Sequence, residues 1–240
     1  MIYENNTTTN YYDLDAQGDV KLTAMLKHIN LAAAKNAAEM GIGLADTLPL
    51  AFVLQRFGLR IYQWPVWNQP IRIRTWPAEI VKGTFQRNGE MYSENDEKMA
   101  EWISLWVLID IEARKVRRPS ALSVELPTYG RMGVTIEAHK VNAEEGELLS
   151  TYNHIVRFSE TDTYQHMNNV VYADLIANVL YESQSPLARP QNWTEIQINY
   201  IAETRIGDEI EMQCRQAGKT INILGSVEGR DSFASSIITK

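Results

Sequence analysis

Cysteine is almost absent from this chain of 240 residues, which has a single one, Cys214. One cysteine cannot form an intrachain disulfide, and alone it cannot hold zinc or an iron–sulfur cluster. Because Cys214 stands in the alternating run DEIEMQCRQ, we interpret it as a buried, unreactive thiol of a strand. The chain also lacks the paired histidines of a metal site, since its four histidines are scattered over positions 28, 139, 154 and 166. We expect neither a metal nor a cofactor.

Long apolar runs and an excess of positive charge are missing too. No stretch approaches the roughly 20 apolar residues that span a bilayer, and the opening MIYENNTTTNYYDLD has neither the basic start nor the apolar run of a signal peptide. We therefore expect a cytoplasmic protein with no membrane partner. The net charge of −7 opposes binding to nucleic acid, which needs a basic surface.

One local cluster is basic despite this balance, and it consists of Arg114, Lys115, Arg117 and Arg118. It follows an apolar run that is typical of a strand. The cluster is a candidate docking surface for an acidic partner, and a solvated strand end is the alternative interpretation.

The first half of the chain predicts a helix followed by strands. Apolar residues recur at spacings of three and four from Val20 to about Met40, which indicates a buried helix that Gly41 and Gly43 end. Strand-like runs follow over residues 51–64, 70–81, 84–99 and 101–111. The pair Asn88-Gly89 is typical of a tight hairpin, so we expect the third run to be two arms of an antiparallel ribbon.

The second half repeats this order, with a helix from about Asn168 to Leu180 and strands over residues 195–204, 208–218, 220–228 and 232–240. Matching landmarks near Asn68 and Asp208 give an offset of 208 − 68 = 140 residues. A helix packed on an antiparallel sheet is an α+β layer pattern, and we expect it twice. Two unrelated α+β domains are the alternative.

The segment RFSETDTYQHMNNVVYADLIANVL is the richest in reactive side chains, because Asp162, His166, Asn168 and Asn169 fall within eight residues where a loop turns into a helix. Helix capping explains one such side chain but not an acid, an imidazole and two carboxamides together. A helix N-terminus offers unpaired N–H groups that stabilise an oxyanion. If the helix starts near Met167, both asparagines lie in its first turn.

The spacing of Asp162, His166, Asn168, Asn169 and Tyr172 resembles the signature of hotdog-fold thioesterases. Over nearly its whole length the chain is similar to the acyl-ACP thioesterases of plants and bacteria, with supporting segments YYDLDAQGDVKLTAMLKHIN, SLWVLIDIEARKVRRPS and INYIAETRIGD. The resemblance implies an α+β double hotdog fold. It implies an N-terminal unit, residues 1–130, that shapes the acyl pocket and is catalytically silent. A connection, residues 131–150, and a catalytic C-terminal unit, residues 151–240, follow.

By this resemblance the catalytic aspartate falls on Asp162, the histidine on His166 and the acidic residue of a later strand on Glu203, with Asn168 beside them. Strand parity turns Glu203 away from the apolar side of its strand, which fits a pocket or a plain surface position.

Two positions depart from the family. Tyr164 stands where plant members have an asparagine, and Thr204 where they have a cysteine. With Asn169, we take them as secondary or oxyanion positions. Because Thr204 has no thiol, a papain-like mechanism is excluded there.

The implied reaction is hydrolysis of fatty acyl-ACP to free fatty acid and holo-ACP in fatty acid biosynthesis, with acyl carrier protein as the partner. We expect attack by water, with Asp162 or Glu203 as general base and His166 orienting, and direct attack by Asp162 is a second route. An acyl-CoA thioesterase and a non-catalytic acyl-thioester-binding module stay as alternatives, and a homodimer stays open.

Overall fold

The structure is a computed structural model that describes residues 2–43 and 49–240. The chain divides into two compact units, the first of Met1–Tyr11 and Lys27–Ala138, the second of Tyr12–Leu26 and His139–Lys240. Among the described residues, no helix is long and apolar enough to cross a membrane. All strand pairs within the two units are antiparallel, so the predicted α+β class with antiparallel sheets is confirmed.

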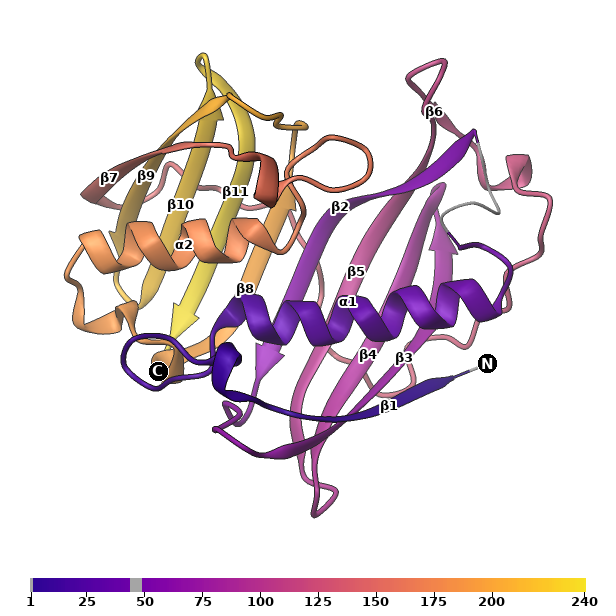
Figure 1. Cartoon of the computed structure of the whole chain (residues 1–240), viewed down its shortest axis with the longest axis horizontal. Helices are drawn as coiled ribbons and strands as arrows, with labels where there is room; N and C mark the ends of the chain where they lie inside the picture. Colours follow the sequence, from indigo (N-terminus) through magenta and orange to yellow (C-terminus); the bar gives the residue numbers. More distant parts are fainter. Residues whose placement is uncertain (1, 44–48) are drawn as a thin grey trace. The chain divides into compact units, whose positions relative to one another are not determined.

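The first unit is a sheet in the order β1-β3-β4-β5-β2, with β6 beside β5 and helix α1 along it (Figure 1). Its elements are β1 (Tyr3–Thr8), α1 (Leu22–Glu39) from Lys27 onward, β2 (Leu50–Ile61), β3 (Pro70–Val81), β4 (Thr84–Ser93), β5 (Lys98–Asp110) and β6 (Lys115–Arg117). The predicted helix and the run over 70–81 are confirmed. The strand β1 was not predicted, because its sequence YENNTT has no apolar alternation.

The two faces of this first sheet bury different partners. Alternation sends Ile71, Ile73 and Thr75 to one face, which α1 covers, and Trp76 to the other. On that other face Trp76 and Ile103 form a buried cluster with Val134 and Ile136 of the connecting segment. The connection is therefore packed structure of the first unit and not a loose linker.

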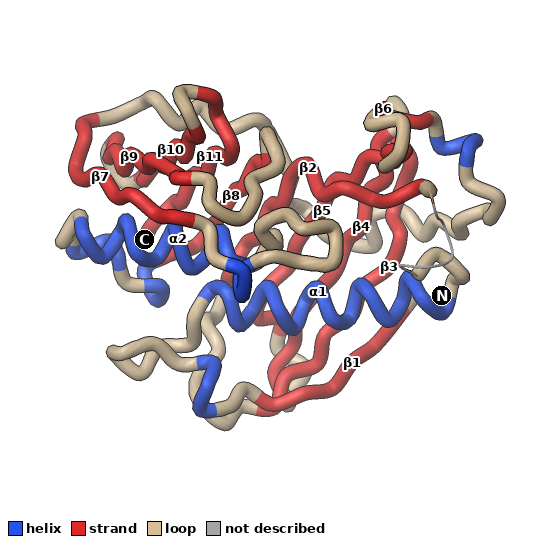
Figure 2. The backbone as a smooth tube through the Cα atoms, turned by 45° about the horizontal axis from the view of Figure 1, so that its top comes forward, coloured by secondary structure: helices blue, strands red, loops and turns tan. Residues whose placement is uncertain are grey.

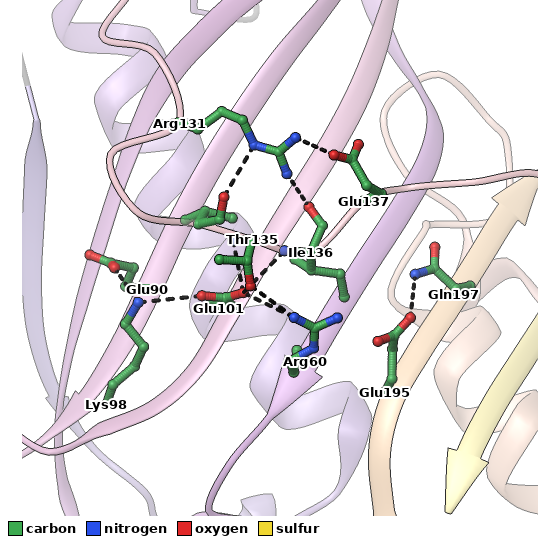
Figure 3. A network of polar contacts seen from close by, with 11 residues as sticks. Arg60, Glu90, Lys98, Glu101, Arg131, Thr135, Ile136, Glu137, Glu195 and Gln197 are labelled. Atoms are coloured by element: carbon green, nitrogen blue, oxygen red, sulfur yellow. Dashed lines mark hydrogen bonds and ion pairs between the residues drawn. The ribbon is translucent and has the colours of Figure 1, made fainter.

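A buried carboxylate fastens this connection to β5 (Figure 3). One oxygen of Glu101 accepts hydrogen bonds from the Thr135 N–H at 3.0 Å, the Thr135 hydroxyl at 2.7 Å and the Ile136 N–H at 3.1 Å. Its other oxygen lies 3.3 Å from Lys98 Nζ. Burial alone would raise the pKa of Glu101, but these bonds from Thr135 and Lys98 outweigh it and hold the pKa below 4.5.

The second unit has the sheet order β7-β9-β10-β11-β8, with α2 along one face (Figure 2). Its elements are β7 (Glu147–Ile155), α2 (Val171–Glu182), β8 (Trp193–Tyr200), β9 (Glu209–Ala217), β10 (Thr220–Val227) and β11 (Arg230–Thr239). This is the strand order of the first unit when β1 is matched with β7. Cys214 on β9 is buried, and burial raises the pKa of its thiol to about 11, so the expected buried thiol is confirmed.

The predicted hairpin at Asn88-Gly89 is wrong, because both residues lie inside β4. The turn between β3 and β4 is instead at Lys82 and Gly83, whose φ angles are 50° and 83°. Gly89 serves a close approach: a Cβ there would lie 2.1 Å from Cζ2 of Trp102. A glycine that makes room for an indole looks, in sequence, like a turn glycine.

Candidate active site

Helix α2 begins at Val171, so the expectation that Asn168 and Asn169 lie in its first turn is wrong. They form the turn before it. The Asn168 Oδ1 accepts from the Val170 N–H at 3.1 Å, and the Asn168 carbonyl accepts from the Val171 N–H at 2.9 Å. Asparagine favours such side-chain bonds to nearby backbone over a helical position, and this delays the start of the helix.

The N–H groups of this turn are mostly occupied. The Met167 N–H donates to the Thr204 carbonyl, and the Asn168 N–H donates to the Glu160 carbonyl, each at 2.8 Å. The Asn169 N–H, by contrast, has no acceptor within residues 2–43 and 49–240. It is the N–H of this turn that is left to donate to an oxyanion.

Asp162 shapes the loop that carries His166. Its Oδ1 accepts from the Tyr164 N–H at 2.8 Å and from the His166 N–H at 3.4 Å. Its own N–H donates to the His166 carbonyl at 2.9 Å. No contact recorded for the described residues joins the Asp162 carboxylate to the His166 ring. The structure thus gives Asp162 a loop-forming contact that the sequence did not predict.

His166 and Glu203 are brought together, with 3.0 Å between Nε2 and Oε2. Both side chains are partly exposed, at 30% and 40%. The backbones are joined next to this pair, because His166 and Arg205 form an isolated antiparallel bridge. A carboxylate and an imidazole in hydrogen-bond contact at a solvent-accessible position can orient and deprotonate a water molecule.

Glu203 is not on a strand, contrary to the parity argument. Strand β8 ends at Tyr200, and the N–H groups of Ile201 and Ala202 both bind the Ser232 carbonyl, at 2.8 and 3.0 Å. This shared acceptor breaks the ladder, so the chain leaves the sheet before Glu203. Alternation therefore says nothing of where its side chain points.

Arg205 is a neighbour of the site that the sequence did not predict. Its Nη2 lies 2.9 Å from Glu203 Oε1, so Glu203 is held from both of its oxygens. The Arg205 N–H in turn donates to Asp208 Oδ2 at 2.8 Å. The only sequence signal was a basic residue two positions after the acid.

Thr204 turns inward, away from Glu203. Its hydroxyl lies 2.9 Å from the Tyr172 hydroxyl, and the Tyr172 ring contacts Tyr200 and Phe233 edge-on at 5.3 and 5.0 Å. Burial raises the pKa of Tyr172 to about 12, against the opposing effect of the Thr204 hydrogen bond. Thr204 therefore anchors the loop to the core of the second unit.

The remaining predicted positions lie at the edge of this loop or elsewhere. Tyr164 is half-buried, and burial followed by the nearby Asp162 charge raises its pKa. The four basic residues of the first unit are exposed: Arg114 in the β5–β6 turn, Lys115 and Arg117 in β6, and Arg118 directly after it. Their role as a docking surface stays a prediction.

A second histidine–carboxylate pair holds the start of this loop at Glu160. His154 Nε2 lies 2.8 Å from Glu160 Oε2, which also accepts from the Arg157 N–H at 2.7 Å. Since the Glu160 carbonyl accepts from the Asn168 N–H, this pair fixes one side of the loop. Neither residue was singled out in the sequence, because their six-residue separation follows no motif.

Comparison with known proteins gives matches along both halves of the chain. The family model described as the acyl-ACP thioesterase N-terminal domain matches residues 1–121, and the one described as the acyl-ACP thioesterase C-terminal domain matches residues 140–232. A chloroplast palmitoyl-acyl carrier protein thioesterase of Gossypium hirsutum is 21% identical over 223 residues, which are 85% of this chain and 52% of that protein. A chloroplast dodecanoyl-[acyl-carrier-protein] hydrolase of Cinnamomum camphora is 20% identical over 76% of this chain and 52% of that protein.

Solved structures share the fold. An acyl-ACP thioesterase from Bacteroides thetaiotaomicron has a TM-score of 0.84 at 18% identity, covering 100% of this chain and 98% of that one. The 12:0-ACP thioesterase from Umbellularia californica has a TM-score of 0.80 at 15% identity, covering 100% and 97%. The chain spans about half the length of the chloroplast relatives, at 52% for both.

Proposed function

The chain belongs to the acyl-ACP thioesterase family, and we propose on that premise that it hydrolyses fatty acyl-ACP to free fatty acid and holo-ACP. The observation that carries the proposal is the contact between His166 and Glu203, 3.0 Å apart at a solvent-accessible loop. Such a pair can take a proton from water and so start hydrolysis. Acyl carrier protein bearing a fatty acyl chain is the proposed partner.

We propose further that the two units are tandem hotdogs, with the acyl pocket in the first and the reaction in the second. The identical strand order of the two sheets supports this proposal. The segment DLDAQGDVKL, which leads into α1 as the Asp162 loop leads into α2, has no histidine or asparagine pair, so the chemistry is assigned to the loop that holds Asp162 and His166, together with Glu203.

In the proposed mechanism Glu203 accepts the Nε2–H of His166, which leaves Nδ1 to take a proton from water. The resulting hydroxide oxygen attacks the thioester carbon, and the Asn169 N–H donates to the oxyanion that forms. The carbon–sulfur bond then breaks, and the thiolate receives the proton from His166. Asp162 holds the loop through Oδ1, and Asn168 closes the turn before α2.

The test is turnover of purified acyl-ACP by variants at the two carboxylates. Glu203→Gln should lower kcat by about 10²–10⁴-fold, because it removes the charge that supports His166 as base, and Asp162→Ala, which removes the Oδ1 acceptor of the loop, should lower kcat as well. The matched control is Glu228→Gln, because Glu228 also pairs with an arginine two residues on, Arg230, at 3.8 Å on an exposed turn. This variant should keep full activity.

Two results would overturn the proposal in different ways. If both Glu203→Gln and Asp162→Ala hydrolyse acyl-ACP as fast as the unaltered chain, the site is wrong. If the unaltered chain binds acyl-ACP tightly and releases no thiol, it is a binding module. Matched acyl-CoA substrates run beside acyl-ACP separate the two carriers.

A further inference from the structure

Arg87 is a cation buried inside the first unit, between its sheet and α1. The side chain leaves β4 on the face that α1 covers, and the residue is 9% exposed. Its Nη1 donates to Asn36 Oδ1 of α1 at 2.8 Å and to the Thr75 hydroxyl of β3 at 3.3 Å. Asn36 and Thr75 are themselves fully buried, at 0%.

Within residues 2–43 and 49–240, no carboxylate forms an ion pair with this cation. Both recorded acceptors are neutral, and Arg87 forms no ion pair with any described residue. The N–H groups on its Nε and Nη2 have no acceptor within the described ranges either. Burial lowers the pKa of Arg87 to about 10. A buried charge is costly unless it is paired and hydrogen-bonded.

The other face of the same sheet shows how this unit treats its remaining buried charges. There Glu90 lies 2.7 Å from Lys98 Nζ, and Glu101 pairs with both Lys98 and Arg60. Each buried acid is matched by a cation. Arg87 is the exception, because its acceptors among the described residues, Asn36 and Thr75, are both neutral.

The buried side chains of α1 become smaller toward Asn36, the residue that contacts Arg87. The first buried positions of the helix carry large apolar residues, Leu22, Met25, Leu26 and Ile29, whereas beyond Ile29 the buried positions are Ala32 and Asn36. The helix thus presents a carboxamide to the guanidinium.

We propose that Arg87 recognises an acceptor oxygen carried on the acyl chain of the substrate. This inference rests on the proposed function and adds a substrate class to it: acyl groups with an oxygen function away from the thioester. The free Nε and Nη2 form the edge of a guanidinium that binds a carboxylate with two parallel hydrogen bonds, so a terminal carboxylate is the strongest ligand. A hydroxyl or keto oxygen accepts fewer of these bonds and ranks below it.

The experiment compares thioesters of one chain length that are unsubstituted, hydroxylated or terminated by a carboxylate, over several lengths. The unaltered chain should show kcat/KM about 10- to 100-fold higher for the best oxygenated substrate than for its plain counterpart, as expected for charge-assisted hydrogen bonds in a buried site. Arg87→Met should lose this preference. Arg72→Met, which removes an arginine paired with Asp96 and Glu4 on the same sheet, should keep it.

A binding measurement separates this inference from the proposed function. In a Glu203→Gln background, calorimetry should detect tighter binding of a dicarboxylic than of a monocarboxylic fatty acid, and Arg87→Met should abolish the difference. Arg87→Lys keeps a charge but not the two-donor edge, so it serves if Arg87→Met does not fold, and it should reduce the preference for carboxylate. Equal binding of both acids by the unaltered site, or an unchanged preference in the folded Arg87 variants, overturns the inference even where hydrolysis is observed.

Discussion

At the residue scale, Glu203 is held between two partners, His166 at Oε2 and Arg205 at Oε1. Arg205 fixes the rotamer of the carboxylate, and therefore the direction of its bond to His166. Arg205 itself is half exposed, at 51%, so the pair contributes little to folding stability. We assign Arg205 as a positioning residue.

Arg205→Gln should lower kcat on the order of 10-fold with KM nearly unchanged, because a misplaced catalytic group costs rate and not binding. Arg205→Lys should recover part of the loss. Steady-state kinetics on acyl-ACP measures both. The control is Arg230→Gln, which changes an exposed arginine paired with Glu228. It should leave kcat and KM unchanged. If Arg205→Gln has the kcat of the unaltered chain, Arg205 is not a positioning residue.

The sequence predicted the main site residues but not their supports. Asp162, His166 and Glu203 came from a family motif, and the structure brings His166 and Glu203 into contact. Arg205 and Glu160 were missed because each acts through a contact set by the fold of a loop. Arg87 was missed because a charged residue on the face that α1 covers interrupts the alternation of apolar and polar residues along β4.

At the element scale, the sheets bring aromatic rings onto glycines. A Cβ on Gly89 would lie 2.1 Å from Trp102 Cζ2 and 2.6 Å from the Arg74 carbonyl, and a Cβ on Gly225 would lie 2.1 Å from Phe233 Cε1. Since β4 matches β10 and β5 matches β11 in strand order, both units use the same device. It fixes the pairing of two central strands.

Gly89→Ala and Gly225→Ala should therefore each destabilise the chain by about 1–3 kcal/mol, the cost of overpacking a core. Urea unfolding followed by circular dichroism measures the change. Ser226→Ala, beside Gly225 and half-buried, should stay within about 0.5 kcal/mol. Full stability of both alanine variants would show that the rings move aside freely.

The connection held by Glu101 gives a pH-dependent prediction. Because its folded-state pKa lies below the ordinary 4.5, its stabilisation is fully present above pH 4.5 and is lost as the pH falls through the folded value. Glu101→Gln should cost about 1–3 kcal/mol at pH 7, and the difference should shrink below pH 4.5.

Thermal unfolding across pH 3 to 7 tests this. Glu137→Gln is the control, since Glu137 pairs with Arg131 in the same segment but is 68% exposed, and exposed pairs contribute about 0–1 kcal/mol. A gap between the Glu101→Gln and unaltered chains that does not change with pH would contradict the assignment.

Element boundaries at the site were the least predictable part of the fold. The start of α2 moved to Val171 because Asn168 uses its side chain to close a turn. Strand β8 ended at Tyr200 because two N–H groups share one acceptor. Neither event changes hydrophobic periodicity, so neither is visible in a pattern of apolar residues.

At the scale of the whole molecule, the repeat was visible in sequence through the 140-residue offset between landmarks. The grouping of Tyr12–Leu26 with the second unit was not. It depends on side-chain contacts such as the Thr23 hydroxyl with Asp174 and Arg189 Nη2 with Asp19 Oδ2 at 2.8 Å. Such contacts join residues more than 150 positions apart and leave no local signal.

The proposed docking of acyl carrier protein belongs to this scale as well. Reversing the charge at Arg117 and Arg118 to glutamate should raise KM for acyl-ACP on the order of 10-fold, because like charges oppose encounter with an acidic partner. The KM for a small acyl thioester should not change. Lys219→Glu with Arg230→Glu, an equal charge change on exposed residues, is the control. If the KM for acyl-ACP is unchanged, the basic cluster does not bind acyl carrier protein.

The central claim is that His166 and Glu203 act as one unit on the thioester. The most direct measurement is a double-mutant cycle of kcat on acyl-ACP with His166→Ala, Glu203→Gln and the pair combined. We predict that the double variant is no slower than the slower single variant, because either change disables the same proton transfer. Losses that multiply in the double variant, or single variants with unaltered kcat, would contradict the claim.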